Sequence, residues 1–282
     1  EPRATEVLVS TNALFSPQFE PIVAKRRRCR LVVEEQRSEE ETPGALGALL
    51  VTARDPPADE PLLVVAGDNV YGFPLARFLE GARANAAPTV AAKLLADKQL
   101  ASSFGVIELA GGTRVAAFHE KPEDPPSSLV ATALYLYPPG WAELFAAYER
   151  AARASPRPRA MLDAPGRILE WAVAHGRAVH AWVFEEPWYD VGSLAGYLDA
   201  LQGTLGPRHV EGHLVDCVEG PGVYVFGDAR ATGSRLEQVV LLPGAVVERS
   251  RLTRCIVDAR ARVVNAALAD SLIGSHDTIV GA

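Results

Sequence analysis

Cysteine, positive charge and long apolar runs are scarce in this chain. Its 282 residues include three cysteines, Cys29, Cys217 and Cys255, whose spacings favour neither a disulfide framework nor a zinc site. No apolar run approaches the ~18 residues that a membrane span needs. The formal net charge of −7 argues against nucleic acid as the main partner. These shortages predict a globular protein of the reducing cytoplasm, with no membrane or nucleic-acid partner.

The first two hundred residues alternate between strand and helix patterns. Strands are expected at residues 6–10, 29–34, 61–66, 89–95, 105–109, 115–119, 130–137 and 179–184. Helices are expected at residues 18–25, 43–53 (with Thr42 as N-cap and Pro43 as first residue), 74–84, 141–152, 167–175 and 193–201. The apolar run at 61–66 suits a strand buried on both faces. The alternation predicts an α/β domain over residues 1–202, with a Rossmann-like, mostly parallel sheet and flanking helices.

After residue 202 the long helical patterns stop and aliphatic residues recur at steps of five or six. The recurring positions are Val240, Val246, Leu252, Val257, Val263, Leu268, Ile273 and Ile279. Such spacing is typical of a parallel β-helix, in which each short face turns one aliphatic side chain inward. A set of β-hairpins with accidental spacing is the alternative. The pattern predicts a short β-helix domain over residues 203–282, serving assembly, so we expect a homo-oligomer.

Two aspartates stand where a ligand site would be expected. Asp68 follows the apolar run PLLVVA in the stretch VVAGDNVY, and Asp190 precedes a helix start in WYDVGS. Each has an ordinary interpretation, because Asp68 suits a turn and Asp190 suits a helix entry. If the fold brings the two together, they form a hard-oxygen site suited to Mg²⁺, which commonly takes one or two carboxylates plus substrate phosphates. That arrangement serves phosphoryl chemistry.

A third candidate is the stretch FHEKP, at the end of an expected strand. Glu120 can accept hydrogen bonds from sugar hydroxyls, and Lys121 can face a phosphate as a compact positive charge. A solvated ion pair is the alternative. Gly105, in the stretch FGV, can let the backbone approach a ligand closely, or can mark a bend in a strand.

The order of these stretches resembles a known family. GDN, FGV, EKP, SSLVATALYLY and WYDVG, followed by hexad-like repeats, are similar to the sugar-1-phosphate nucleotidylyltransferases. The likeness is to the glucose-1-phosphate thymidylyltransferase-like group, which carries a C-terminal left-handed β-helix. Each motif alone is weak, but five in the family's order are specific, and the resemblance spans residues 6–282.

The resemblance implies a reaction and a set of roles. A sugar 1-phosphate attacks the α-phosphate of a nucleoside triphosphate, and pyrophosphate leaves. Asp68 and Asp190 would hold Mg²⁺, and Asp68, Asp190 and Lys121 form the catalytic set. The substrate-binding residues it implies are Gly105, Glu120, Lys121, Tyr135 and Asn69, with Gln36 or Gly44 near the base. The last assignment is loose, because an acidic insertion separates Gln36 from Gly44.

One departure from the family's pattern leaves alternatives open. The family's N-terminal Gly-rich loop, which carries a catalytic Arg, has no counterpart in this sequence. We expect an N-terminal truncation, and an impaired activity for this segment alone. A non-catalytic regulatory or exchange-factor-type subunit of the same architecture is the alternative function. An acyltransferase, suggested by His276 in the repeats, would need a longer β-helix.

Overall fold

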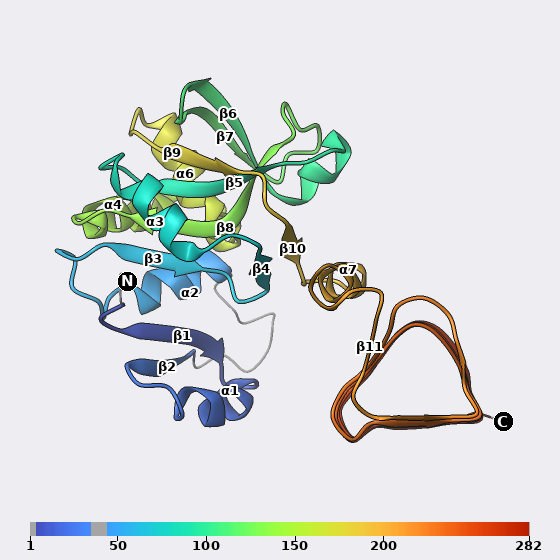
Figure 1. Cartoon of the computed structure of the whole chain (residues 1–282). Helices are drawn as coiled ribbons and strands as arrows, with labels where there is room; N and C mark the ends of the chain where they lie inside the picture. The colour runs from blue at the N-terminus through green and yellow to red at the C-terminus, as the bar shows by residue number, and fades with distance from the viewer. Residues whose placement is uncertain (1–3, 35–43, 282) are drawn as a thin grey trace. The chain divides into compact units, whose positions relative to one another are not determined.

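The computed structural model describes residues 4–34 and 44–281, which form two compact units. The first unit comprises Glu1–Ala66 and Phe73–Glu186, and the second comprises Gly67–Gly72 and Pro187–Ala282 (Figure 1). The boundary expected at residue 202 therefore falls inside the second unit. Within the described residues, the helices lack the length and apolar character that a membrane crossing requires.

The first unit alternates strands and helices much as the sequence predicts. Its strands are β1 (Val7–Asn12), β2 (Cys29–Glu34), β3 (Leu62–Val65), β5 (Thr89–Leu94), β6 (Gly105–Gly111), β7 (Arg114–Glu120), β8 (Leu129–Tyr137) and β9 (His180–Phe184). Its helices are α1 (Ser16–Val23), α2 (Ala45–Thr52), α3 (Leu75–Arg83), the 3-10 helix η2 (Lys98–Ser103), α4 (Trp141–Ala154), α5 (Pro158–Leu162) and α6 (Gly166–Ala174). Helix α2 begins after Gly44, whereas the N-cap expected at Thr42 lies outside the described residues.

Six of these strands form one mixed sheet in the order β3-β8-β5-β9-β7-β6. Parallel pairing joins β5 to β9 and, in a separate two-stranded sheet, β1 to β2. Strand β8 runs antiparallel to β3 and β5, and β7 runs antiparallel to β6 and β9. Strands β3, β5, β6 and β9 therefore share one direction, and the predicted α/β class is confirmed.

Helices cover both faces of this sheet. Adjacent residues of a strand point to opposite faces, so neighbouring residues of β9 contact different helices. On β9, Ala181 faces a core formed with α2, α4 and α6. The next residue, Trp182, stacks edge-on against Phe73 and Phe78 on the other face, where α3 lies. Strand β3 departs from the prediction of burial on both faces. It is an edge strand, and Val65 is 50% exposed.

The second unit begins with a two-stranded sheet and one helix. Strands β4 (Asn69–Tyr71) and β10 (Trp188–Asp190) pair in antiparallel fashion, and α7 (Leu194–Leu205) follows, capped by the Ser193 side chain. Eleven short strands complete the unit: β11 (Arg208–Val210), β12 (His213–Val215), β13 (Val218–Glu219), β14 (Val223–Val225), β15 (Arg230–Thr232), β16 (Arg235–Leu241), β17 (Val246–Glu248), β18 (Arg251–Val257), β19 (Arg262–Val264), β20 (Ala267–Ile273) and β21 (Thr278–Val280).

These strands stack as a parallel β-helix with a three-sided coil (Figure 1). Paired residues in its regular part lie 16 positions apart, as in the series Arg230, Val246, Arg262 and Thr278. The predicted β-helix is confirmed. Six of the eight predicted anchors point to or pack against its core, but Val240 and Val246 do not. The inward positions there are Val239, Leu241 and Val247, and Val240 packs with Leu198 of α7 instead.

One corner of the coil is held by buried serines. The Ser234 hydroxyl accepts a hydrogen bond from the backbone N–H of Ser250 at 3.1 Å, and the Ser250 hydroxyl accepts one from Ala266 at 3.1 Å. Each hydroxyl also donates to a backbone carbonyl two residues earlier in the sequence. Ser234 donates to Thr232, and Ser250 donates to Glu248. Both serines are about 5% exposed or less, so these bonds satisfy backbone groups that water does not reach.

Replacing Ser250 with alanine should destabilise the β-helix by about 1–3 kcal/mol, because the N–H of Ala266 loses its acceptor in a buried corner. The matched control is Ser271→Ala, which removes a similar bond to a carbonyl two residues back but, among the described residues, leaves no backbone N–H without its acceptor. Urea unfolding followed by circular dichroism measures both. Equal effects of the two substitutions would contradict the role given to the corner serines.

Candidate functional site

The pairing of β4 with β10 brings Asp68 and Asp190 together although they are far apart in the sequence. Asn69 is the register partner of Asp190, and the N–H of Val191 donates to the Asp68 carbonyl at 2.8 Å. The Asn69 amide donates to Asp68 Oδ1 at 2.7 Å, and its carbonyl oxygen accepts from Trp188 Nε1 at 2.7 Å. Asn69 therefore orients the Asp68 carboxylate.

Both carboxylates face Gly192. A Cβ atom added at Gly192 would lie 3.0 Å from Asp190 Oδ1 and 3.6 Å from Asp68 Oδ2. The two oxygens can therefore lie no further apart than the sum of these distances. The Gly192 N–H also donates to Asp190 Oδ1 at 2.9 Å. The aspartates thus lie near one another on the β4–β10 ribbon of the second unit, rather than at the predicted rim of the six-stranded sheet, and their role as Mg²⁺ ligands stays a prediction.

This donor set fits a hard divalent cation. Its oxygens belong to carboxylates, and Asp68 is exposed while Asp190 is partly exposed. Among residues 4–34 and 44–281 no group of three or more His, Cys, Asp or Glu side chains gathers as a metal cage. Mg²⁺ is commonly held by one or two carboxylates that leave positions for water and substrate phosphates. The chemistry of the pair therefore suits Mg²⁺ better than a metal that needs a closed cage.

A second candidate group, in the first unit, surrounds Glu120. This residue ends β7, is 9% exposed and has Gly105 of β6 as its register partner. A Cβ at Gly105 would lie 3.1 Å from Glu120 Oε2, and a Cβ at Gly166 would lie 1.8 Å from the same oxygen. The Glu120 carboxylate thus occupies space that two glycines leave open, and the predicted sugar-binding roles of Glu120 and Gly105 stay predictions.

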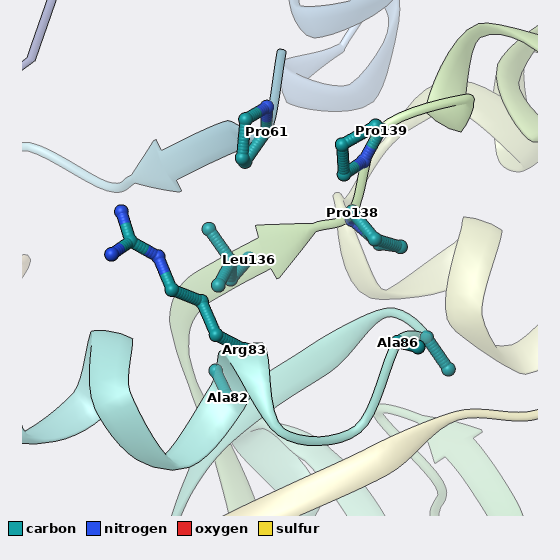
Figure 2. Close-up of a pocket in the computed structure, with 8 residues that line it drawn as sticks. Pro61, Ala82, Arg83, Ala86, Leu136, Pro138 and Pro139 are labelled. Atoms are coloured by element: carbon teal, nitrogen blue, oxygen red, sulfur yellow. The ribbon is translucent and has the colours of Figure 1, made fainter. Parts of the chain in front are cut away.

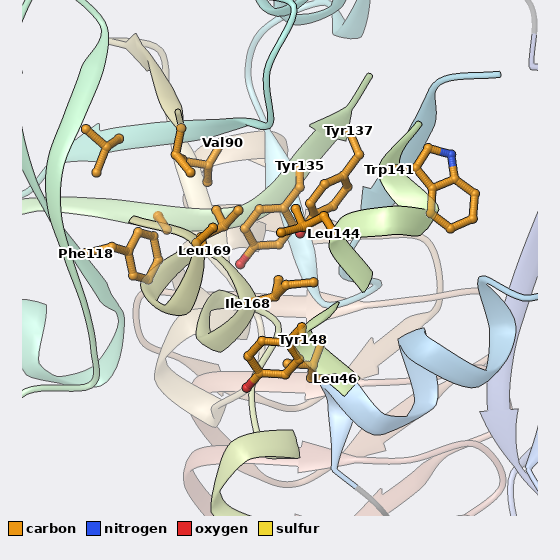
Figure 3. Packing of buried hydrophobic residues seen from close by; sticks show 14 of the residues in the cluster. Leu46, Val90, Phe118, Tyr135, Tyr137, Trp141, Leu144, Tyr148, Ile168 and Leu169 are labelled. Atoms are coloured by element: carbon orange, nitrogen blue, oxygen red, sulfur yellow. The ribbon is translucent and has the colours of Figure 1, made fainter. Parts of the chain in front are cut away.

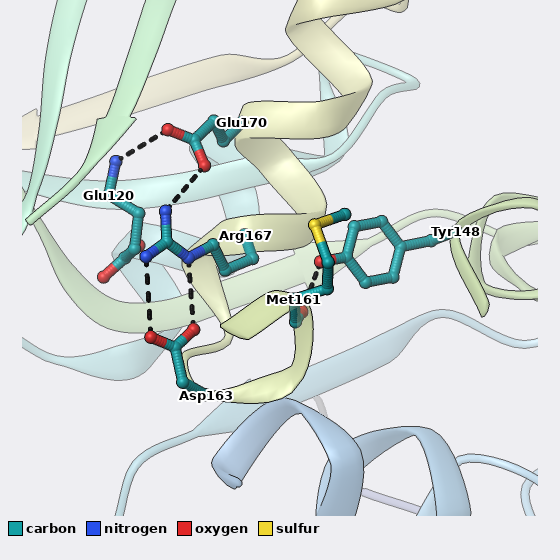
Figure 4. A network of polar contacts seen from close by, with 6 residues as sticks. All are labelled: Glu120, Tyr148, Met161, Asp163, Arg167 and Glu170. Carbon is teal, nitrogen blue, oxygen red and sulfur yellow. Dashed lines mark hydrogen bonds and ion pairs between the residues drawn. The ribbon is translucent and has the colours of Figure 1, made fainter. Parts of the chain in front are cut away.

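A charged network borders this carboxylate (Figure 4). Arg167 donates through Nε to Asp163 Oδ1 at 3.1 Å and through Nη1 to Glu170 Oε2 at 3.1 Å. The other Glu170 oxygen accepts from the backbone N–H of Glu120 at 3.1 Å. Burial raises the pKa of Glu120 to about 7, although the charges of Arg167 and Lys121 oppose the rise.

The other predicted site residues of the first unit include one that is exposed and one that is buried in the core. Lys121 is exposed, in the left-handed region at φ 49°, and its N–H donates to the Phe104 carbonyl at 3.1 Å. Tyr135 is 4% exposed and packs in the core cluster of Figure 3, so its predicted place in a sugar pocket stays a prediction.

Gly44, at φ 80°, abuts the segment that carries Asp163, because a Cβ there would lie 2.3 Å from the Leu162 carbonyl oxygen. Its tight contact explains why glycine stands at this position. Gln36 lies outside the described residues. A role of either residue near a nucleotide base therefore stays a prediction.

A separate cavity of about 310 Å³ contains none of the predicted site residues (Figure 2). Its lining is mostly apolar, and Arg83 of α3 is the charged residue among the lining side chains. A volume near the lower limit of ordinary ligand pockets, without convergent polar groups, gives this cavity no evident chemistry.

Sequence reasoning missed the residues that support the candidate groups. No supporting role was predicted for Gly192, Gly166, Arg167, Glu170 or Trp188. The signal for the charged network was present, because Asp163, Arg167 and Glu170 stand at spacings of four and three, which place side chains close together along a helical turn. The contact of Trp188 with Asn69 has no local signal, since it depends on the pairing of two distant strands.

Comparison with known protein families identifies the family to which this chain belongs. Residues 3–205, more than half of the chain, match the nucleotidyl transferase family. The chain therefore belongs to that family, and the predicted family resemblance is confirmed.

Relatives with described activities are similar to this chain over much of its length. A glucose-1-phosphate adenylyltransferase of Desulfitobacterium hafniense is 24% identical over 239 residues, covering 72% of this chain and 59% of the relative. One from Rhizobium meliloti is 26% identical over 254 residues, covering 78% and 59%. A solved structure described as a glucose-1-phosphate thymidylyltransferase from Bacillus anthracis, in complex with a sucrose, has a TM-score of 0.55 at 19% identity, covering 72% of this chain and 76% of that one. This chain thus spans about three fifths of the first relatives' length, and the structural neighbour supports the fold.

The close fit of Glu120 against Gly166 yields a double-mutant test. Gly166→Ala should destabilise the first unit by about 1–3 kcal/mol, because the added methyl group would overlap Glu120 Oε2. In a Glu120→Ala background the same substitution should cost much less, because the overlapping carboxylate is gone. Urea unfolding of the four proteins measures the coupling. Additive effects would show that Glu120 does not occupy this space.

The raised pKa of Glu120 predicts a pH-dependent stability. An acid whose folded pKa lies near 7, above its ordinary 4.5, makes the protein lose stability as the pH rises from about 4.5 to about 7, because the unfolded state ionises over that range while the buried acid of the folded state stays protonated. Relative to Glu120→Gln, the wild type should lose up to about 3 kcal/mol between pH 4.5 and pH 9. Denaturant unfolding across this range measures the difference, with exposed Glu80→Gln as the control. A constant difference would contradict the assignment.

Proposed function

We propose that the protein transfers a nucleotidyl group from a nucleoside triphosphate to a sugar 1-phosphate, releasing pyrophosphate. The observation that carries the proposal is the convergence of Asp68 and Asp190 on Gly192, in a chain of the nucleotidyl transferase family. The named activities of the similar proteins, which act on glucose 1-phosphate, support the substrate class.

On the phosphate side, Asp68 and Asp190 would hold Mg²⁺. The ion, when bound, supplies positive charge that offsets the charge of the phosphates and the leaving pyrophosphate. The protein's own contribution is orientation. The Asn69 amide fixes Asp68, and the Gly192 N–H fixes Asp190, so both carboxylates keep their positions before substrate arrives.

On the sugar side, Glu120 would accept hydrogen bonds from sugar hydroxyls, and Lys121 would face the sugar phosphate. Lys121 suits this role because its ammonium group is exposed and carries a compact charge. Gly105 leaves room for backbone approach beside Glu120. A phosphate oxygen of the sugar 1-phosphate then attacks the α-phosphorus of the nucleoside triphosphate. The bond between the α-phosphorus and the oxygen that bridges to the β-phosphate breaks, and pyrophosphate departs. Little covalent work falls to the protein, so positioning and charge dominate.

Pyrophosphate release by the full-length protein tests this proposal, across panels of sugar 1-phosphates and nucleoside triphosphates with Mg²⁺ present. We expect release with at least one pair. Asp190→Asn should lower kcat by about 10²-fold or more, since loss of one electrostatic contact to a transition state has an effect of this order. Asp199→Asn is the matched control, because Asp199 is an exposed carboxylate on the neighbouring helix α7.

Two results would contradict the proposal. Absence of pyrophosphate release with every pair would favour the alternative of a non-catalytic subunit. Release that Asp190→Asn leaves unchanged would remove the role given to the aspartate pair, because the carboxylate that faces Gly192 would then be dispensable.

A further inference from the structure

The carboxylate of Glu120 sits in surroundings that oppose its ionisation. It is 9% exposed and wedged between Gly105 and Gly166, and two further carboxylates, Asp163 and Glu170, lie in the same network. Burial and like charges both favour the neutral acid. A neutral acid keeps one O–H donor, whereas an ionised carboxylate offers two acceptor oxygens to hydroxyl groups. Recognition of a sugar by the carboxylate therefore requires some group that favours ionisation.

Arg167 is placed to do this. It is the second residue of α6, its side chain is 25% exposed, and its guanidinium group is held by Asp163 on one side and Glu170 on the other. The planar fork of an arginine can satisfy two carboxylates in a fixed orientation. Its position therefore does not depend on a bound ligand, and its charge acts on Glu120 before substrate arrives.

A mechanical link accompanies the electrostatic one. Glu170 accepts from Arg167 with one oxygen and from the backbone N–H of Glu120 with the other, so the end of β7 is tied to the N-terminal half of α6. The adjoining residue, Lys121, turns sharply at φ 49°. The network thus fixes the backbone where the two predicted sugar-side residues stand.

The geometry points to Arg167 as a positioning residue: it holds Glu120 in place through Glu170 and favours the ionised carboxylate that accepts sugar hydroxyls. This inference rests on the proposed function for the identity of the ligand, but the effect of Arg167 on Glu120 is a property of the free protein. Arg167 touches no reacting atom and acts through another residue.

Among the residues that the structure describes, titratable and charged groups from several elements act on Glu120. Arg167 and Glu170 come from α6, Asp163 from the segment before it, Lys121 from the end of β7, and Tyr148 from α4. Arg167 and Lys121 are positive and lower the pKa of Glu120, whereas Glu170 and Asp163 raise it. Tyr148 donates its hydroxyl to the Met161 carbonyl, and burial raises its pKa, so it stays neutral in the range that matters.

The first experiment measures the ionisation of Glu120 without any activity. Carboxyl-carbon NMR of the labelled full-length protein, with Glu120→Gln to assign the resonance, gives the pKa directly. Arg167→Met should raise it by about one unit, and Glu170→Gln should lower it, because the latter removes a negative charge while keeping an acceptor for the Glu120 N–H. Arg150→Met, an exposed arginine on α4, is the control and should leave the value unchanged.

Opposite shifts in two variants keep the test decisive even if one folds poorly. Arg167→Lys, which retains the charge but not the fork, should shift the pKa of Glu120 less than Arg167→Met. If Glu170→Gln and Arg167→Met both leave the pKa of Glu120 unchanged, the inference is wrong. If the methionine variant is unfolded, Arg167→Lys decides, because Glu170→Gln would lower the pKa of Glu120 whatever Arg167 does.

The second experiment links ionisation to recognition. In the active protein, Arg167→Met should raise KM for the sugar 1-phosphate about 5-fold near pH 7, with a smaller change in kcat, and the difference should shrink above pH 9 as Glu120 ionises in both proteins. The titration of the substrate's own phosphate is common to all variants and cancels. Expected NMR shifts with an unchanged KM would overturn the sugar-binding part of the inference. Absence of any activity in the wild type would instead contradict the proposed function and leave the NMR result standing.

Discussion

The antiparallel pairing of β4 with β10 is the contact on which the candidate phosphate side depends. Three residues of each strand pair, and this short ribbon joins Asp68 to Asp190 across more than a hundred residues of sequence. The Trp188–Asn69 hydrogen bond and the Val191–Asp68 backbone bond secure its end. Loss of this pairing would leave each aspartate an ordinary turn residue, because neither alone offers the two carboxylates that a shared cation requires.

The two candidate groups use glycine for the same physical purpose. At Gly192 and at Gly166 the missing Cβ atom leaves the space next to a carboxylate oxygen. In the first group the carboxylates remain accessible, whereas Glu120 is enclosed, and burial raises its pKa against the opposing charges of Arg167 and Lys121. A buried acid beside a positively charged side chain lowers the stability of the folded state but keeps its carboxylate in a fixed orientation. This arrangement is common at functional sites.

The sequence allows the local elements to be predicted, but not the long-range ones. Strand β2 spans the six residues expected, and α7 begins one residue after its expected start at Ser193, because alternation and helix entry are local signals. Strands β4 and β10 were not expected, since three residues carry too little periodicity. The burial of β3 was overestimated, because an apolar run does not reveal whether its strand lies at an edge. Asp68 and Asp190 could be proposed as partners, but the network of Arg167 could not be traced to Glu120 without the fold.

The constant coil length of the β-helix limits how this protein can change. Inward residues such as Leu241, Val257 and Ile273 stack at intervals of 16, and the corner positions Gln238, Arg254 and Asp270 keep the same interval in the left-handed backbone region. Deleting a single residue would turn every later aliphatic side chain toward water and every later polar one inward. Viable insertions and deletions within the stacked coils are therefore those of whole coils, so that this part of the molecule lengthens or shortens by duplication and loss of complete turns.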